Sequence, residues 1–159
     1  MDSKPPHQPQ HLPRRNLPLL FLQARESVFS RFRPILNSAG ITEQQWRVVR
    51  ALLDNGPLEQ RRLGQVCQLS NPSLAGILAR MEQLGYVARE RLDHDQRRVK
   101  VSVTGQGEAL AAQLAPTIGA TYRALEEELG VELAGQLYAT LDAVIARLGE
   151  APAGEDAGG

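Results

Sequence analysis

Cationic side chains gather in one short stretch of the chain, Asp95–Gly107, where they could bind an anion. Arg97, Arg98 and Lys100 follow an acidic turn, and guanidinium and ammonium groups are the side chains that neutralise phosphate. Valines alternate with polar residues over 99–103, which is the period of a half-buried strand. The chemistry that these residue types support is recognition of a phosphate backbone.

A second strand is expected just upstream, at Tyr86–Leu92, and residues 93–96 would join the two strands as a hairpin. Thr104 is expected to end the later strand and to cap a helix that begins there. A basic hairpin that directly follows two short helices is the wing of a winged helix-turn-helix, so we expect this unit to bind DNA. Phosphate contacts are expected from Arg89, Arg91 and Arg98.

The two short helices are expected at residues 59–67 and 72–84, with a polar turn between them. The outward face of the second helix is small, uncharged and hydroxyl-rich at its start, which would let the helix approach base edges in the major groove. A purely structural pair of helices could show the same pattern, but the hairpin that follows favours DNA binding. This face presents Ser73, Gly76, Arg80 and Gln83.

Longer helices flank this lobe. Apolar residues recur with the helical period from Leu17 to Ile35, from Leu110 to Leu129 and from Ala134 to Leu148. These long amphipathic helices have more apolar surface than the small winged unit can cover, so a second copy should pack on them. We expect a mainly α (α+β) fold with an extended arm at 1–16, helical dimerisation regions at 17–40 and 104–149, a winged helix-turn-helix lobe at 41–103, and a flexible tail at 150–159.

A capping-box pattern, Thr42 followed by Gln45, predicts the start of one more helix. Its apolar spacing places Leu53 in the core, and the spacing of the short helix that follows places Val66 there. Both expectations rest on helical periodicity.

The charge distribution suits a protein with one face toward nucleic acid. The chain has 159 residues with equal numbers of acidic and basic side chains. Lys and Arg outnumber Asp and Glu by six to two in residues 1–42 and by ten to seven in 43–104, whereas acids lead by nine to two in 105–159. A basic front and an acidic back fit a surface that meets phosphate on one side.

Other chemistry finds little support in the sequence. His7 and His11 lie in the proline-rich arm without a cluster of acids or cysteines, so no metal site is expected. No phosphate loop or nucleophile–base pair is visible, so neither an enzyme nor a cofactor is expected. Cys67 is the one cysteine; it is either a small core residue or a redox sensor. The single cysteine and the absence of an export signal point to the cytoplasm.

With these residues in hand, the chain resembles the MarR family of bacterial transcription regulators. The family's wing signature, Asp-x-Arg followed by spaced aliphatic residues, Thr and Gly, is matched by Asp95–Gly107. The segments Leu22–Ser27, Ile41–Arg50 and Pro72–Glu82 are similar to the branch that regulates homoprotocatechuate degradation, and regulators of nicotinate degradation look similar too.

The resemblance implies a homodimer that binds double-stranded DNA at a pseudo-palindromic operator. Arg97 would enter the minor groove at the wing tip, with Asp95 holding its side chain in place, although Asp95 is also a typical turn residue. The implied DNA-binding residues are Ser70, Asn71, Pro72, Ser73, Gly76, Arg80, Arg91, Asp95, Arg97 and Arg98. The competing interpretation is a winged helix reused as a protein–protein interaction module.

The resemblance also implies a repressor that is released from DNA by a small hydroxylated aromatic carboxylate, such as a hydroxyphenylacetate or a hydroxynicotinate. Arg25 lies on the apolar side of its helix, where it would either pair with an acid of the C-terminal helices or anchor this ligand. Trp46 is either a core residue or a pocket wall. The candidate ligand-binding residues are Arg14, Arg15, Gln23, Arg25, Gln45, Trp46 and Arg47.

Overall fold

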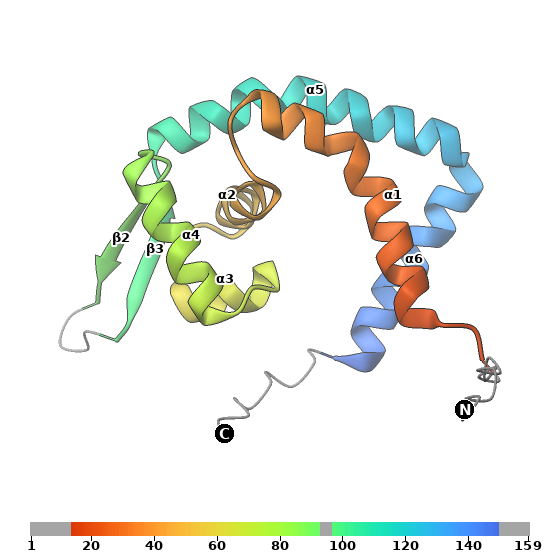
Figure 1. Cartoon of the computed structure of the whole chain (residues 1–159), viewed down its shortest axis with the longest axis horizontal. Helices are drawn as coiled ribbons and strands as arrows, with labels where there is room; N and C mark the ends of the chain where they lie inside the picture. Colours follow the sequence, from red (N-terminus) through yellow and green to blue (C-terminus); the bar gives the residue numbers. More distant parts are fainter. Residues whose placement is uncertain (1–13, 93–96, 150–159) are drawn as a thin grey trace, which may run out of the picture.

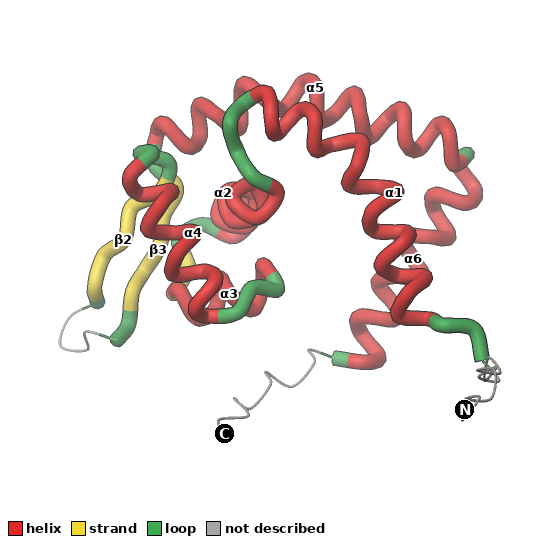
Figure 2. The backbone as a smooth tube through the Cα atoms, viewed as in Figure 1, coloured by secondary structure: helices red, strands yellow, loops and turns green. Residues whose placement is uncertain are grey.

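The computed structural model describes residues 14–92 and 97–149 and confirms a mainly helical winged-helix fold (Figures 1 and 2). Helix α5 runs along one side of the molecule. One end of the molecule is formed by α1 and α6, and the other end by α2, α3, α4 and the strands. The elements are α1 (Leu17–Ser38), α2 (Glu43–Asn55), β1 (Leu58–Glu59), α3 (Gln60–Cys67), α4 (Asn71–Gln83), β2 (Val87–Arg91), β3 (Val99–Val103), α5 (Gly105–Leu129) and α6 (Val131–Leu148).

The predicted hairpin is present and has a third strand that the sequence did not predict. The sheet order is β1-β3-β2, with both pairs antiparallel. Val87 pairs with Val103, and Leu58 of β1 pairs with Val101, which is fully buried. A strand of two residues is too short to show the alternating pattern by which strands are predicted. Strand β1 is defined by its backbone pairing with the edge of β3 that β2 leaves open.

Polar side chains cap the starts of α2, α4 and α5, and the caps at Thr42 and Thr104 are those that the sequence predicted. The Thr42 hydroxyl accepts a hydrogen bond from the Gln45 N–H, and the Gln45 side chain accepts one from the Thr42 N–H. Ser70 caps α4 through the Ser73 N–H, and Thr104 caps α5 through the Gly107 N–H. Each cap satisfies an N–H group that the first turn of a helix leaves without a partner.

One core joins the lobe to the long helices. Helix α2 contributes Val48, Val49 and Leu52 to it, all of which are almost fully buried. The expectations for Leu53 and Val66 are wrong, because these side chains are 40% and 38% exposed. In α3, the buried residues are Leu63, Gly64 and Cys67, which place Val66 on the outer side of a helix of only two turns.

Thr104 and its neighbours join α4, β2 and α5. The Thr104 N–H donates to the Tyr86 carbonyl (3.0 Å), and the Thr104 hydroxyl donates to the Gly85 carbonyl. Gly85 ends α4 with a φ of 80°, a left-handed conformation that favours glycine. These bonds fix the start of the long helix against the end of the recognition helix.

Two apolar faces remain uncovered in the single chain. At the start of α1, Leu17, Leu19, Phe21 and Leu22 are each more than 40% exposed. Helix α6 buries only Ala134 and exposes six large apolar side chains, namely Val131, Leu133, Leu137, Tyr138, Ile145 and Leu148. Contiguous exposed apolar surface of this kind is typical of an interaction surface.

Within residues 14–92 and 97–149, no single helix is long and apolar enough to cross a membrane; the pair α5 and α6 passes on length and composition together but bends by 106°.

Gly107 tests how tightly the start of α5 is packed. A Cβ atom at this position would lie 2.3 Å from the Tyr86 carbonyl oxygen and 2.7 Å from a Val103 methyl group. We expect Gly107→Ala to destabilise the protein by about 1–3 kcal/mol, because the backbone at Tyr86, just before β2, must move to make room. Thermal unfolding measured at equal protein concentrations checks this.

Gly105→Ala is the matched control, because a Cβ there meets no atom within 4 Å in the same turn of α5. It should leave the melting temperature unchanged or raise it slightly. Equal effects of the two substitutions would contradict the packing described for this junction.

Candidate functional site

The recognition helix α4 presents the face that its sequence predicted. Ser70, Asn71, Pro72, Ser73, Gly76, Arg80 and Gln83 are all exposed. A Cβ placed at Gly76 would meet no atom within 4 Å, so the middle of this face is open. The inner face is buried through Leu74, Leu78 and Met81. Helix α4 is therefore anchored on one side and free on the other, as a helix must be to enter a groove.

The arginines of the wing are in part engaged with carboxylates of their own lobe. Arg89 binds Glu82 of α4 at 3.0 Å, and Arg98 binds Glu59 of β1. The hydrogen bonds from these arginines lower the pKa of Glu82 and of Glu59. The pairs are exposed, so a phosphate can compete with the carboxylate for each guanidinium.

Arg91 and Arg97 are exposed at the two sides of the wing tip. Asp95, which was expected to orient Arg97, lies outside the described residues. The DNA-binding roles of Arg91, Arg97 and Arg98 stay predictions, and the structure places all three at the distal half of the same hairpin.

A cavity of about 310 Å³ lies between α1, α2 and α5. It is lined by Val28, Phe29, Phe32, Leu36, Trp46, Arg50, Asp54, Ile118 and Tyr122. The Phe32 and Tyr122 rings pack with centroids 4.8 Å apart and planes tilted by 55°. The Arg50 Nε–H donates to both Asp54 carboxylate oxygens, at 3.0 and 2.9 Å. Apolar and aromatic walls with one charged pair are what a small aromatic acid requires.

Of the predicted ligand-binding residues, Trp46 alone lines this cavity among the described residues. Gln45 is 7% exposed and completes the capping box. Arg14 and Arg15 are exposed before the start of α1, and Gln23 is exposed in its second turn. Their role in ligand binding stays a prediction.

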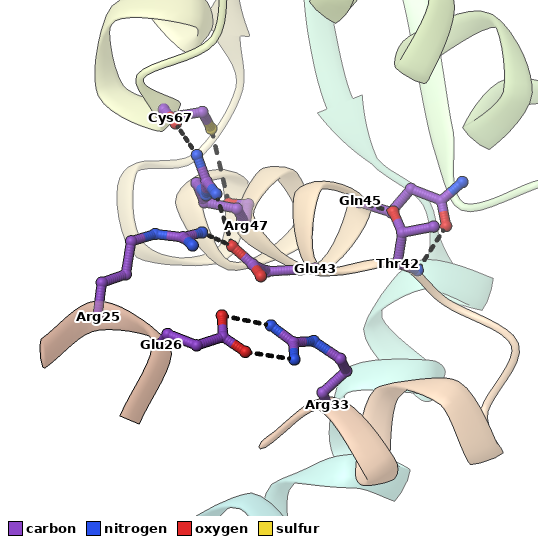
Figure 3. Close-up of polar contacts among 8 residues, drawn as sticks. All are labelled: Arg25, Glu26, Arg33, Thr42, Glu43, Gln45, Arg47 and Cys67. Carbon is purple, nitrogen blue, oxygen red and sulfur yellow. Dashed lines mark hydrogen bonds and ion pairs between the residues drawn. The ribbon is translucent and has the colours of Figure 1, made fainter. Parts of the chain in front are cut away.

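Arg25 and Arg47 bind the same carboxylate (Figure 3). Both guanidinium groups donate to Oε1 of Glu43, the first residue of α2. The acid that pairs with Arg25 therefore belongs to α2, and the expected partner on the C-terminal helices is wrong. Arg31, six residues further along α1, pairs instead with Glu128 of α5 at 2.7 Å.

Cys67 is fully buried at the end of α3, as a small core residue would be. Its carbonyl accepts a hydrogen bond from Arg47 at 2.8 Å, and its thiol lies 3.6 Å from the Arg47 carbonyl. Burial raises the pKa of this thiol, although the nearby Arg47 opposes the change. A buried thiol with a raised pKa is poorly suited to sensing oxidants, so the structural interpretation is favoured.

Sequence reasoning missed Arg50 and Tyr122. Arg50 lies four residues after Trp46 on the same face of α2, so the helical period could have indicated it once Trp46 was taken as a pocket wall. Tyr122 comes from α5 and reaches the cavity only through tertiary packing.

Within the described ranges, no three His, Cys, Asp or Glu side chains are grouped as metal ligands, and His7 and His11 lie outside those ranges.

Known proteins resemble this chain over most of its length. The sequence model of the MarR family matches residues 39–98. The HTH-type transcriptional regulator FarR of Neisseria gonorrhoeae is 45% identical over 111 residues, covering 70% of this chain and 76% of FarR. The homoprotocatechuate degradative operon repressor of Escherichia coli is 39% identical over 131 residues, covering 82% of this chain and 88% of the repressor.

Among solved structures, NadR in complex with 4-hydroxyphenylacetate is 39% identical, with a TM-score of 0.74, and the match covers 86% of this chain and 97% of NadR. The identity to the homoprotocatechuate repressor confirms the branch that the segments of α1, α2 and α4 indicated. The chain therefore belongs to the MarR family of transcription regulators.

Proposed function

We propose that the protein is a homodimeric DNA-binding repressor that a small hydroxylated aromatic carboxylate releases from its operator. The observation that carries this proposal is the cavity at Trp46, Arg50 and Tyr122, between the dimerisation helices and the winged-helix lobe. NadR, at 39% identity, is known with 4-hydroxyphenylacetate bound, and the related Escherichia coli protein represses a homoprotocatechuate operon.

The exposed face of α4 and the basic wing support DNA binding. A helix that is buried on one side and free on the other fits the major groove, and Arg97 at the wing tip fits a narrow, negative minor groove. Arg91 and Arg98 are placed to neutralise phosphates on either side. The pseudo-palindromic operator follows from a dimer with one such lobe per subunit.

The uncovered apolar faces of α1 and α6 support the homodimer, because a second copy would bury them. With these faces paired, the two lobes of the dimer would be held at a defined spacing. Operator half-sites lie about one helical turn apart, so a small change in that spacing prevents both lobes from docking together.

The cavity supports an aromatic carboxylate as the effector. Its volume of about 310 Å³ is small, close to the lower limit for ligand pockets. The rings of Trp46, Phe32 and Tyr122 would contact the aromatic ring of the ligand. The Arg50 guanidinium, which Asp54 orients through Nε, has further N–H donors for a carboxylate. Hydroxyphenylacetates and hydroxynicotinates both have this chemistry.

The same observations favour a regulator over an enzyme, and a DNA-binding protein over a winged-helix interaction module. The relatives are transcription regulators rather than enzymes. A protein with this role would act in the cytoplasm, where the chromosome is.

A gel shift on the protein's own promoter tests DNA binding, and absence of binding at low salt would refute the DNA-binding proposal.

Arg97→Ala should weaken operator binding by roughly 5- to 100-fold, or about 1–3 kcal/mol, because the minor-groove contact is lost. Fluorescence anisotropy with a promoter fragment measures the effect. Arg33→Ala is the control for loss of charge, since Arg33 pairs with Glu26 on α1, away from the lobe. Loss of dimerisation or folding in Arg97→Ala, in place of a selective loss of affinity, would contradict the assigned role.

Added 4-hydroxyphenylacetate should raise the melting temperature and release DNA. At a ligand concentration of 100 times Kd the stabilisation is about 2.7 kcal/mol. Arg50→Gln should lose most of both responses, because a neutral amide cannot replace the charge-assisted contact.

The matched ligand control is the corresponding alcohol, 2-(4-hydroxyphenyl)ethanol, which lacks the carboxylate and should do neither. If no hydroxyphenylacetate or hydroxynicotinate changes the melting temperature or the DNA affinity, the effector part of the proposal is wrong.

A further inference from the structure

One wall of the cavity is connected to the helix-turn-helix by a continuous series of contacts. Phe29 of α1 lines the cavity, and the Arg25 guanidinium lies over its ring, 4.6 Å from the centroid. This is the geometry of a cation–π contact. A ligand that displaces the Phe29 ring must therefore act on Arg25.

Glu43 receives the next contact. Its Oε1 accepts hydrogen bonds from both Arg25 of α1 and Arg47 of α2, the latter at 2.9 Å (Figure 3). The Glu43 side chain is only 19% exposed, so solvent screens these contacts less than it screens a surface pair. Because both guanidinium groups bind the same carboxylate oxygen, a movement of Arg25 changes the position of the Glu43 carboxylate and therefore its contact with Arg47.

Arg47 continues the series to the helix-turn-helix. It donates to the Cys67 carbonyl at the end of α3, at 2.8 Å. Cys67 is followed by Gln68 in the left-handed region, with φ of 52°, and by the Ser70 cap of α4. This short turn sets the position of the recognition helix, so a change at the Cys67 carbonyl reaches α4 within three residues.

We infer that Glu43 is a positioning residue that transmits ligand binding at the cavity to the recognition helix, through Phe29, Arg25, Glu43, Arg47 and the Cys67 carbonyl. Glu43 neither lines the cavity nor belongs to the DNA-facing surface. It acts by holding Arg25 and Arg47 in one arrangement that ligand binding changes. This inference rests on the proposed function, because it requires an effector at the cavity and DNA at α4.

A coupling factor measures the transmission directly. It is the ratio of the operator Kd with saturating 4-hydroxyphenylacetate to the operator Kd without it. In Glu43→Gln this ratio should fall by about 3- to 30-fold. The affinity for DNA without ligand and the calorimetric affinity for ligand without DNA should stay near the wild-type values, which a merely structural role for Glu43 would not allow.

Two further variants make the test specific. Arg25→Met keeps an apolar stem over Phe29 but removes the contact with Glu43, so its coupling factor should fall like that of Glu43→Gln. It also answers the question if Glu43→Gln folds poorly, because it leaves the contact between Glu43 and Arg47 in place. Glu26→Gln breaks the pair with Arg33, which lies within α1 and joins no second element, so its coupling factor should equal that of the wild type.

The coupling measurements distinguish a failure of this inference from a failure of the proposed function. Unchanged coupling in both Glu43→Gln and Arg25→Met, with a normal response of the wild type, would overturn the inference and leave the proposed function intact. A wild-type protein that binds DNA but shows no response to 4-hydroxyphenylacetate or to hydroxynicotinates would overturn both.

Discussion

The hydroxyl of Thr104 makes the contact on which the arrangement of the lobe depends. It accepts from the Gly107 N–H to begin α5 and donates to the Gly85 carbonyl at the end of α4. The recognition helix, the wing and the long helix therefore share one junction, which the close approach of Gly107 to Tyr86 leaves little room to deform. Because packed junctions shift between discrete arrangements more readily than they deform, we expect the lobe to move as a unit with α5.

In the proposed function, two routes connect the cavity to DNA. One is α5 itself, which contributes Ile118 and Tyr122 to the cavity and begins directly after the wing strand β3. The other is the polar series through Glu43, which ends at the turn before α4. We expect the first route to move the lobe relative to the dimer and the second to adjust α4 within the lobe. A ligand can use either route only through a difference in its affinity for the two arrangements.

Local patterns predicted the parts of this structure that local interactions determine. The alternating valines gave β3, and the cap residues, including Thr104, marked where helices begin. Contacts between segments that are distant in the sequence were harder to predict. Arg98 finds Glu59 only because the unpredicted β1 pairs with β3, and the cavity combines Trp46 with Tyr122 only after α2 packs on α5. The sequence therefore indicated Trp46 as a possible pocket wall but could not identify the other residues that line the cavity.

The central claim is that an aromatic acid at the cavity changes the spacing of the two recognition helices. The single native cysteine is buried, so a spin label attached at Ala75→Cys, on the exposed face of α4, would report the distance between the two helices of the dimer. Pulsed dipolar spectroscopy with and without 4-hydroxyphenylacetate measures that distance. We expect the distribution to shift by a few ångströms when the ligand binds. An unchanged distribution under conditions where calorimetry shows the cavity to be occupied would contradict the account.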